Sequence, residues 1–331
     1  MMMRTGSKTM NRYLKFVLFG LVSSIVSLSA CNGSLPSPTQ KGPATYQQRM
    51  DLVTGGFRRS YRVHIPSGYD GLTQLPMVVV IHGAFDTAKG MEKFSGFSHL
   101  ANRENFVVLY PEGIGIFGYL QHWNAGHCCG KAANDKIDDV GYLADAIKDV
   151  CNRLSIDRNR VYMVGFSNGG MMTYRFAAEH TDMLAAAASI AASIGGRPNQ
   201  DAPQWRIPAP KKRLPILIMH GLNDDDVPFG GGVSMHRKGG RTYLSVDASV
   251  QFWIDANGCQ GEPVVSTSHD GAVQITAWDT CTDSSMTVLC KLDGWGHLWP
   301  GPYFTGKLSK DDPLYNLDAA EMIWSFFKQF S

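Results

Sequence analysis

The sequence lacks an excess of either charge, an internal repeat and a Ser/Thr/Pro-rich linker inside its body. Its 331 residues carry 31 Lys and Arg against 29 Asp and Glu, a formal charge of +2. Such a balance offers no basic surface to a nucleic acid or another polyanion, so we expect no nucleic-acid partner. Without a repeat or an internal linker, one domain over residues 46–331 is the simplest organisation.

Acidic residues are absent from the first 30 positions, where a basic start precedes the apolar run Phe16–Val26. That run is too short to span a bilayer, and the small residues that follow it complete the three-part layout of an export signal. Leu28-Ser29-Ala30-Cys31 resembles a bacterial lipobox, in which the cysteine is diacylated and becomes the new N-terminus. We therefore expect a lipoprotein signal peptide over residues 1–30 and lipid on Cys31. A plain cleaved signal with an incidental cysteine is the alternative.

Residues 31–45 are rich in Pro, Ser and Gly and are predicted to be a flexible tether. Two acyl chains give lasting anchorage where one is marginal. Asn32 follows the cysteine in place of Asp, which by resemblance to Gram-negative lipoproteins favours the outer membrane. The expected location is thus exported and lipid-anchored, at the outer membrane or surface of a bacterium.

Cysteine is scarce: only six cysteines follow Cys31 in the chain. An even number of cysteines in an exported protein suggests disulfides. Fifteen pairings are possible, and we expect Cys259 to pair with Cys281. A bond between the neighbours Cys128 and Cys129 would strain the peptide between them, so separate partners are expected for these two. The other two cysteines are Cys151 and Cys290.

Short apolar runs alternate with amphipathic segments from residue 60 to the end, which predicts an α/β fold with a mostly parallel sheet and helices on both faces. The predicted strands are Pro76–His82, Phe106–Tyr110, Val161–Phe166, Leu214–His220 and Met286–Cys290. The predicted helices are Val140–Leu154, Gly169–His180, Ser245–Asn257 and Leu317–Phe330.

Gly165-Phe-Ser-Asn-Gly169 fits the G-x-S-x-G pattern and lies between a predicted strand and a predicted helix. On such a sharp turn the serine oxygen is exposed, and the flanking glycines allow close backbone packing. This context predicts Ser167 as a nucleophile. A serine needs a histidine to take its proton and a carboxylate to orient that histidine.

The acid and the base follow in the order Ser, acid, His. The segment His220–Phe229 fits H-G-x-x-D-x-x-V-P, which selects Asp224 and leaves Asp225 and Asp226 as solvent-facing loop residues. His297 lies after the last predicted strand and is the predicted base. His82 and His220 end strands and are expected to pack or hydrogen-bond around the site.

Backbone N–H groups must stabilise the oxyanion that develops on the substrate. Asn168 follows the nucleophile and is one candidate; Ala84, after the early strand, is the second, with Phe85 as the alternative. The segment His122–Cys129 also contains two His and two Cys, the ligand types zinc prefers. Its spacing matches no zinc pattern, and exported cysteines are more often bridged, so no metal and no cofactor is expected.

Taken together, these motifs resemble the esterase branch that contains feruloyl esterases, acetyl xylan esterases and poly(3-hydroxybutyrate) depolymerases, related to carbohydrate esterase family 1. Further shared pieces are Trp123-Asn124 ahead of Asp138–Tyr142, and Gly296–Gly301 around the histidine. The resemblance covers roughly residues 50–331 and implies a single-domain α/β-hydrolase fold and ester hydrolysis through an acyl-serine, without a cofactor.

The resemblance also implies that Trp123 and Trp299 flank the site as substrate-binding walls; two core tryptophans are the alternative. Trp295 and Leu298 depart from the Gly and Thr that the family more often has there.

The resemblance favours a feruloyl or acetyl esterase that acts on plant polysaccharide fragments. A poly(3-hydroxybutyrate) depolymerase would share the triad, and we expect it to carry an extra polymer-binding domain after the last helix. A prolyl-oligopeptidase-like peptidase shares two motifs, but the Trp-Pro-Gly after His297 and the missing propeller argue against it. An inactive binding lipoprotein is expected to have lost a triad member.

Overall fold

The computed structural model describes residues 44–54, 57–116, 118–236 and 239–331. The predicted signal peptide, Cys31 and the tether up to residue 43 lie outside these described residues. The described residues belong to one compact unit. Within the described residues, no helix is long and apolar enough to cross a membrane.

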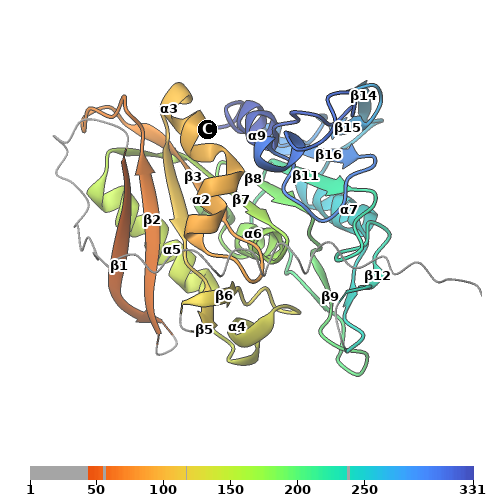
Figure 1. Cartoon of the computed structure of the whole chain (residues 1–331), viewed down its shortest axis with the longest axis horizontal. Coiled ribbons are helices and arrows are strands. Elements are labelled where there is room, and N and C mark those ends of the chain that lie inside the picture. The colour runs from red at the N-terminus through yellow and green to blue at the C-terminus, as the bar shows by residue number, and fades with distance from the viewer. Residues whose placement is uncertain (1–43, 55–56, 117, 237–238) are drawn as a thin grey trace, which may run out of the picture. The chain divides into compact units, whose positions relative to one another are not determined.

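A sheet of ten strands runs through this unit in the order β1-β2-β4-β3-β7-β8-β11-β16-β15-β14 (Figure 1). The six central strands from β4 to β16 are parallel, and an antiparallel hairpin extends the sheet at each edge. The strands are β1 (Ala44–Thr54), β2 (Phe57–Ile65), β3 (Leu75–Ile81), β4 (Val107–Pro111), β7 (Ile156–Phe166), β8 (Ala186–Ile190), β11 (Ile216–Gly221), β14 (Val264–Ser268), β15 (Val273–Trp278) and β16 (Thr287–Leu292).

Strand β3 shows why its sequence is a near-continuous apolar run. Met77, Val79 and Ile81 pack into the core on one face of the sheet, while Val78 and Val80 pack into the core on the other. Successive side chains of a strand point to opposite faces, so a strand covered on both faces must be apolar at every position. The predicted α/β-hydrolase architecture is confirmed.

Helices cover both faces of the sheet (Figure 1). Residues of α5, α6 and α7 pack into one core, and residues of α2, α3 and α9 pack into the other. Side chains cap several helix starts, because Asp138, Ser245 and Asp318 each accept a hydrogen bond from a backbone N–H in the first turn. The bounds are α2 (Ala88–Ser95), α3 (Phe97–Glu104), α5 (Asp139–Arg153), α6 (Asn168–Glu179), α7 (Val246–Asn257) and α9 (Ala319–Phe327).

Short elements that the sequence did not predict lie beside the carboxyl ends of the central strands. They comprise a hairpin and the small helix α4 on one side, and a small second sheet of order β10-β9-β13-β12 on the other. Their bounds are β5 (Ile114–Ile116), β6 (Tyr119–His122), α4 (Gly130–Asn134), β9 (Gly195–Arg197), β10 (Trp205–Arg206), β12 (Gly232–Val233) and β13 (Thr242–Tyr243). The remaining helical turns are η1 (Thr181–Met183), η2 (Thr282–Ser284) and α8 (Pro302–Thr305).

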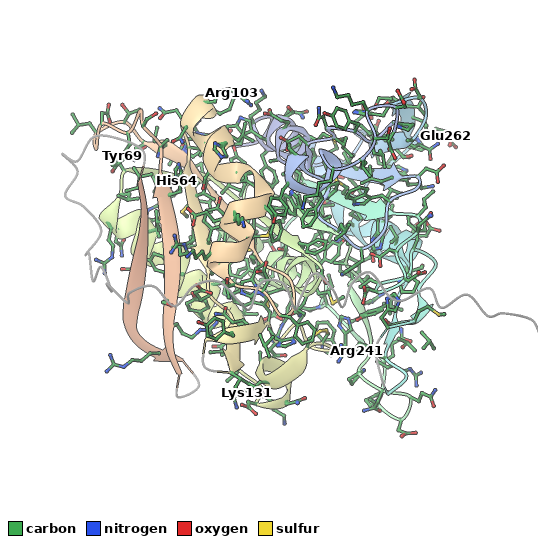
Figure 2. All side chains as sticks on the ribbon, viewed as in Figure 1. His64, Tyr69, Arg103, Lys131, Arg241 and Glu262 are labelled. Carbon is green, nitrogen blue, oxygen red and sulfur yellow. A yellow bond between two sulfur atoms is a disulfide. The ribbon has the colours of Figure 1, made fainter. Side chains whose placement is uncertain are left out.

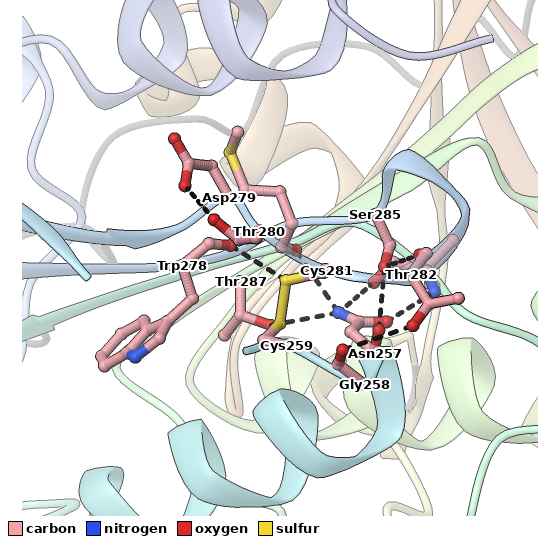
Figure 3. Close-up of a disulfide and its surroundings, with 12 residues drawn as sticks. Asn257, Gly258, Cys259, Trp278, Asp279, Thr280, Cys281, Thr282, Ser285 and Thr287 are labelled. Carbon is pink, nitrogen blue, oxygen red and sulfur yellow. Dashed lines mark hydrogen bonds between the residues drawn. A yellow bond between two sulfur atoms is a disulfide. The ribbon is translucent and has the colours of Figure 1, made fainter. Parts of the chain in front are cut away.

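The predicted disulfide between Cys259 and Cys281 is present in the structure. It joins the chain just after α7 to the loop after β15 (Figure 3). Asn257, the last residue of α7, donates a side-chain hydrogen bond to Thr287 Oγ1 at 3.1 Å, which ties the helix end to β16 as well. The disulfide and this hydrogen bond therefore both hold α7 to the end of the sheet that lies farthest from β1.

The expectation of separate partners for Cys128 and Cys129 is wrong. The structure joins these two neighbours to each other, and Cys151 and Cys290 are free thiols. Cys290 belongs to the core on the opposite face of the sheet from Cys128 and Cys129, so it cannot reach them. Cys151 lies in α5, which packs on the same face, but the structure does not bond it to either.

Candidate active site

Ser167 occupies the sharp turn between β7 and α6. Its φ of 55° and ψ of −121° lie where a residue with a side chain is strained, which is typical of a nucleophile held at a strand-to-helix turn. The turn needs glycine on both sides. A Cβ on Gly165 would overlap the carbonyl of Gly169, and a Cβ on Gly169 would overlap the carbonyls of Ile81 and His82.

The structure brings the three predicted triad side chains into one hydrogen-bonded chain. Ser167 Oγ lies 2.8 Å from His297 Nε2, and His297 Nδ1 lies 2.7 Å from Asp224 Oδ2. With Nδ1 protonated, the imidazole donates to the carboxylate and accepts from the serine, which is the arrangement that general-base activation requires. Ser167 comes from the end of β7, Asp224 from the loop after β11 and His297 from the loop after β16.

Asp224 is held as an anion by its surroundings. Burial opposes ionisation, but hydrogen bonds with His220 and His297 outweigh it and lower the pKa of Asp224 well below its ordinary value. The backbone N–H groups of Asp226 and Val227 also donate to Oδ1, at 2.9 and 2.8 Å. Asp225 is exposed, and Asp226 lies 3.5 Å from His236.

The two strand-end histidines are buried around the site, as expected. His220 donates from Nε2 to the carbonyl of Val227 at 2.8 Å, which closes the turn that carries Asp224. His82 lies 2.7 Å from the carbonyl of Gly83 and accepts from the N–H of Gly113 at 3.1 Å. Burial lowers the pKa of His82 to about 4, so the ring is neutral and acts as a structural hydrogen-bonding group.

The candidate oxyanion-hole residues Ala84 and Asn168 line one cavity with Ser167. The N–H of Phe85, the alternative to Ala84, already donates to the carbonyl of Gln121 at 2.8 Å. This leaves Ala84 as the better candidate on that loop. Asn168 starts α6, where the positive end of the helix dipole favours developing negative charge.

Asn168 is fixed by a contact that the sequence did not reveal. Its side-chain oxygen accepts from the N–H of Trp123 at 2.8 Å, and its side-chain nitrogen donates to the carbonyl of Trp123 at 3.0 Å. The indole Nε1 of Trp123 donates to the carbonyl of His82 at 2.9 Å. Trp123 thus links the two segments that carry the candidate oxyanion-hole groups.

Asp138 and Asp139, at the start of the shared segment Asp138–Tyr142, have different roles in the structure. Asp138 caps α5, whereas Asp139 accepts from the N–H of Asn124 at 2.7 Å and so holds the loop after Trp123. Asp139 also pairs with buried Arg59 at 2.7 Å. Arg59 follows no motif, and no feature of the sequence indicated this partner.

The expected substrate-binding role of Trp123 and Trp299 is not supported by their positions. Both indoles are 0% exposed, and neither lines the cavity. Trp299 packs against Phe97 and Phe166 in the core. The aromatic residues that line the cavity are instead Phe85, His122 and Tyr243.

The cavity beside Ser167 has a volume of about 310 Å³, at the small end for a ligand site. Apart from Ala84, Ser167 and Asn168, it is lined by Phe85, His122, Cys128, Cys129, Gly130, Met171, Val227, Arg241 and Tyr243. Among the described residues, no group of three or more His, Cys, Asp or Glu side chains is placed to hold a metal ion. The bridged Cys128 and Cys129 form part of the cavity wall.

Comparisons with known proteins point to esterases. Residues 59–199 match the family described as Esterase PHB depolymerase. Feruloyl esterase B of Piromyces equi is 28% identical over 275 residues, which cover 82% of this chain and 45% of that protein. Poly(3-hydroxyalkanoate) depolymerase C of Paucimonas lemoignei is 35% identical over 132 residues, which cover 39% of this chain and 30% of that one.

Among solved structures, an acetyl xylan esterase from Aspergillus awamori superposes with a TM-score of 0.53 and 16% sequence identity. The superposition covers 76% of this chain and 94% of that one, and it shows the shared fold. The fold is one that an acetyl xylan esterase also has, and the relatives are named for ester hydrolysis, so the class that this chain resembles is the serine esterases of the α/β-hydrolase fold. Within that class, the chain resembles the branch of feruloyl esterases, acetyl xylan esterases and polyhydroxybutyrate depolymerases, as its motifs predict. It spans less than half the length of the two curated relatives named above.

Proposed function

We propose that this chain is an exported, lipid-anchored esterase that releases feruloyl or acetyl groups from plant polysaccharide fragments through an acyl-serine intermediate. The observation that carries the proposal is the hydrogen-bonded chain from Ser167 through His297 to Asp224 at the edge of a small cavity. The chemistry needs only these side chains, two backbone N–H groups and water.

In the first half of the reaction, Ser167 Oγ attacks the ester carbonyl while its proton passes to His297 Nε2. Asp224, already ionised, stabilises the imidazolium that forms. The oxyanion of the tetrahedral intermediate accepts hydrogen bonds from the N–H groups of Ala84 and Asn168. The C–O bond to the alcohol then breaks, and His297 gives its proton to the departing oxygen.

The second half repeats these steps with water as the nucleophile. His297 takes a proton from the water as its oxygen attacks the acyl-serine carbonyl, and the same N–H groups bind the second oxyanion. Collapse of that intermediate returns the proton to Ser167 Oγ and releases the acid. Each turnover therefore consumes one water and leaves the enzyme unchanged.

The choice of acyl group rests on the cavity and on the relatives. A volume of about 310 Å³ suits one acyl group better than a polymer segment. Phe85 and Tyr243 offer aromatic surface to a planar cinnamoyl ring. The likeness to a feruloyl esterase extends over twice as much of the chain as the likeness to a depolymerase.

A polyhydroxybutyrate depolymerase is the second candidate, favoured by the match of residues 59–199 to that family. Export rests on the three-part signal layout of residues 1–30 and lipid anchoring on the lipobox at Cys31, because that segment lies outside the described residues. Intact mass of membrane-extracted protein tests the anchor. A mature chain that starts at Cys31 with added acyl mass supports it, and a soluble, unacylated chain contradicts it.

Turnover of methyl ferulate, acetylated xylan, 4-nitrophenyl acetate and hydroxybutyrate trimer tests the substrate class. We expect the first three to be cleaved and kcat/KM on methyl ferulate to exceed that on the trimer. Ser167→Ala should abolish all turnover, while Ser98→Ala, a serine on α3 away from the cavity, serves as the control. Faster cleavage of the trimer would move the assignment to the depolymerases.

A further inference from the structure

Arg241 places a positive charge in the wall of the cavity that contains Ser167. Of the described residues that line this cavity, it alone carries a permanent charge, and none is an Asp or a Glu. Figure 2 labels its side chain, which extends toward the two bridged sulfurs. A lining of this kind is selective for charge as well as shape.

The guanidinium has no oxygen acceptor among the described residues. Nη1 lies 3.5 Å from the sulfurs of both Cys128 and Cys129, which are weak acceptors, and buried Nε has no hydrogen-bond partner. Acidic groups nearby are engaged elsewhere, since Asp224 binds His297 and Asp226 lies beside His236. Arg241 is half-buried, and a charge partly withdrawn from water without a counter-ion is costly to the fold unless a ligand compensates for it.

The backbone holds Arg241 in place. The N–H of Ser234 donates to its carbonyl at 3.0 Å, and the next two residues pair with β9 as strand β13. Neighbouring His127 adds no charge, because burial and the charge of Arg241 lower its pKa to about 3. A positioned guanidinium with free N–H groups binds a planar carboxylate by two parallel hydrogen bonds.

From this geometry we infer that Arg241 forms a carboxylate-binding subsite and that the preferred substrates are esters whose acyl or alcohol half carries a carboxylate. The inference rests on the proposed esterase function and narrows its substrate class. Two sources have this chemistry: a uronic acid within a polysaccharide fragment, and the free acid end of a hydroxyalkanoate oligomer. The cavity is small enough for one ligand to contact Ser167 and Arg241 together.

Matched ester pairs test the subsite. For the acyl half, 4-nitrophenyl hemisuccinate is compared with 4-nitrophenyl butyrate, which has the same four-carbon chain without the carboxylate oxygens. For the alcohol half, hydroxybutyrate dimer is compared with its primary amide, and O-acetyl galacturonic acid with O-acetyl galactose. The last two pairs distinguish the two sources. The measured quantity is the ratio of kcat/KM for the charged member to that for the neutral member.

Wild-type enzyme should favour the charged member of at least one pair by about tenfold or more, the size of one good charge-assisted interaction. Arg241→Gln should bring that ratio to about one, mainly through KM, and Arg241→Lys should keep part of it. Arg197→Gln is the matched control, because Arg197 is an exposed arginine on the neighbouring strand β9, outside the cavity. Thermal unfolding confirms that each variant is folded.

Ratios near one in all three pairs for wild type, or a ratio that Arg241→Gln leaves unchanged, would overturn the subsite. Binding to Ser167→Ala, measured by calorimetry with hemisuccinate and butyrate esters, separates this failure from a failure of the proposed function. If that variant binds the charged ester about tenfold more tightly while wild type cleaves no ester, the subsite stands and the esterase proposal falls. Equal binding of both esters counts against the subsite.

Discussion

At the scale of single residues, Asp224 differs from Asp225 and Asp226 in what its carboxylate contacts. Only Asp224 reaches His297, at 2.7 Å, and its low pKa keeps it ionised. Asp224→Asn should therefore lower kcat by about 10⁴, since an amide stabilises the wrong histidine tautomer and no imidazolium. Asp225→Asn and Asp226→Asn should change kcat by less than about threefold. Steady-state turnover of 4-nitrophenyl acetate measures all three, and a sensitive Asp225 or Asp226 would show that the motif register is wrong.

Phe85 has the cavity-lining position that the resemblance implies for Trp123. Trp123 is buried and donates to the His82 carbonyl, whereas Phe85 is 53% exposed and lines the cavity. Trp123→Phe should lower the free energy of unfolding by about 1–3 kcal/mol, because it leaves a buried acceptor without its donor. It should reduce kcat/KM on methyl ferulate and on 4-nitrophenyl acetate by the same factor.

Phe85→Ala should instead act on the acyl preference. Loss of one aromatic contact of about 0.5–1.5 kcal/mol predicts a drop of about 2- to 12-fold in kcat/KM on methyl ferulate beyond any drop on 4-nitrophenyl acetate. The two esters differ in whether the acyl group has a ring, so their ratio isolates the contact. A ratio changed by Trp123→Phe and not by Phe85→Ala would restore the tryptophan as the acyl-binding wall.

At the scale of secondary-structure elements, the turn from β7 to α6 depends on the absence of a side chain at Gly169. A Cβ there would meet the carbonyls of Ile81 and His82 at the end of β3, so the helix start and that strand would have to separate. Gly169→Ala should thus misplace both Ser167 and Asn168. We expect kcat/KM on 4-nitrophenyl acetate to fall at least about 100-fold, as expected for a displacement of about 1 Å at a reacting centre.

Gly230→Ala is the control for this variant. Gly230 has no atom within 4 Å of an added Cβ, and its φ is not in the left-handed region, so alanine fits without strain. Near-wild-type activity is expected for it. Normal activity of Gly169→Ala would show that β3 and α6 can move apart without harm to the site.

The elements that the sequence predicted are five central parallel strands and four amphipathic helices, whereas the long edge strands β1 and β2 and the central strand β8 were not predicted. Apolar runs located the five strands that carry or flank the site, and capping residues such as Ser245 begin helices where periodicity predicts them. Strands of two or three residues, such as β9, β12 and β13, have no period to detect. Tyr243 lies in β13 and Arg241 directly precedes that strand, which is why sequence reasoning missed both cavity residues.

For the molecule as a whole, chain order predicted which loops converge, because the carboxyl ends of parallel strands meet at one edge of the sheet. That rule brings Ser167, Asp224 and His297 together from segments 130 residues apart. It does not say which way a side chain beside the edge points, so Trp123 is predicted to line the cavity, with the core as the alternative. Only packing decides between them.

Acid stability is a property of the whole molecule that its buried histidines predict. Burial lowers the pKa of His82 to about 4 and that of His127 to about 3, while both rings titrate near 6.5 in the unfolded chain. At a pH between the folded and the unfolded pKa, each ring is protonated in the unfolded state and neutral in the folded state. The stability from each ring is therefore fully present above pH 6.5 and is lost as the pH falls toward the folded value.

His127→Phe isolates one of these contributions. The ring lies between Trp205 and Tyr243, and neither of its nitrogens has a hydrogen-bond partner, so phenylalanine replaces it without loss of a bond. Urea unfolding at pH 7 and pH 5 should show that wild type loses about 2 kcal/mol more stability than His127→Phe over this interval. His99→Phe, at an exposed position on α3, should follow the wild-type pH dependence in parallel. Equal losses for wild type and His127→Phe would mean that His127 accepts a proton in the folded state.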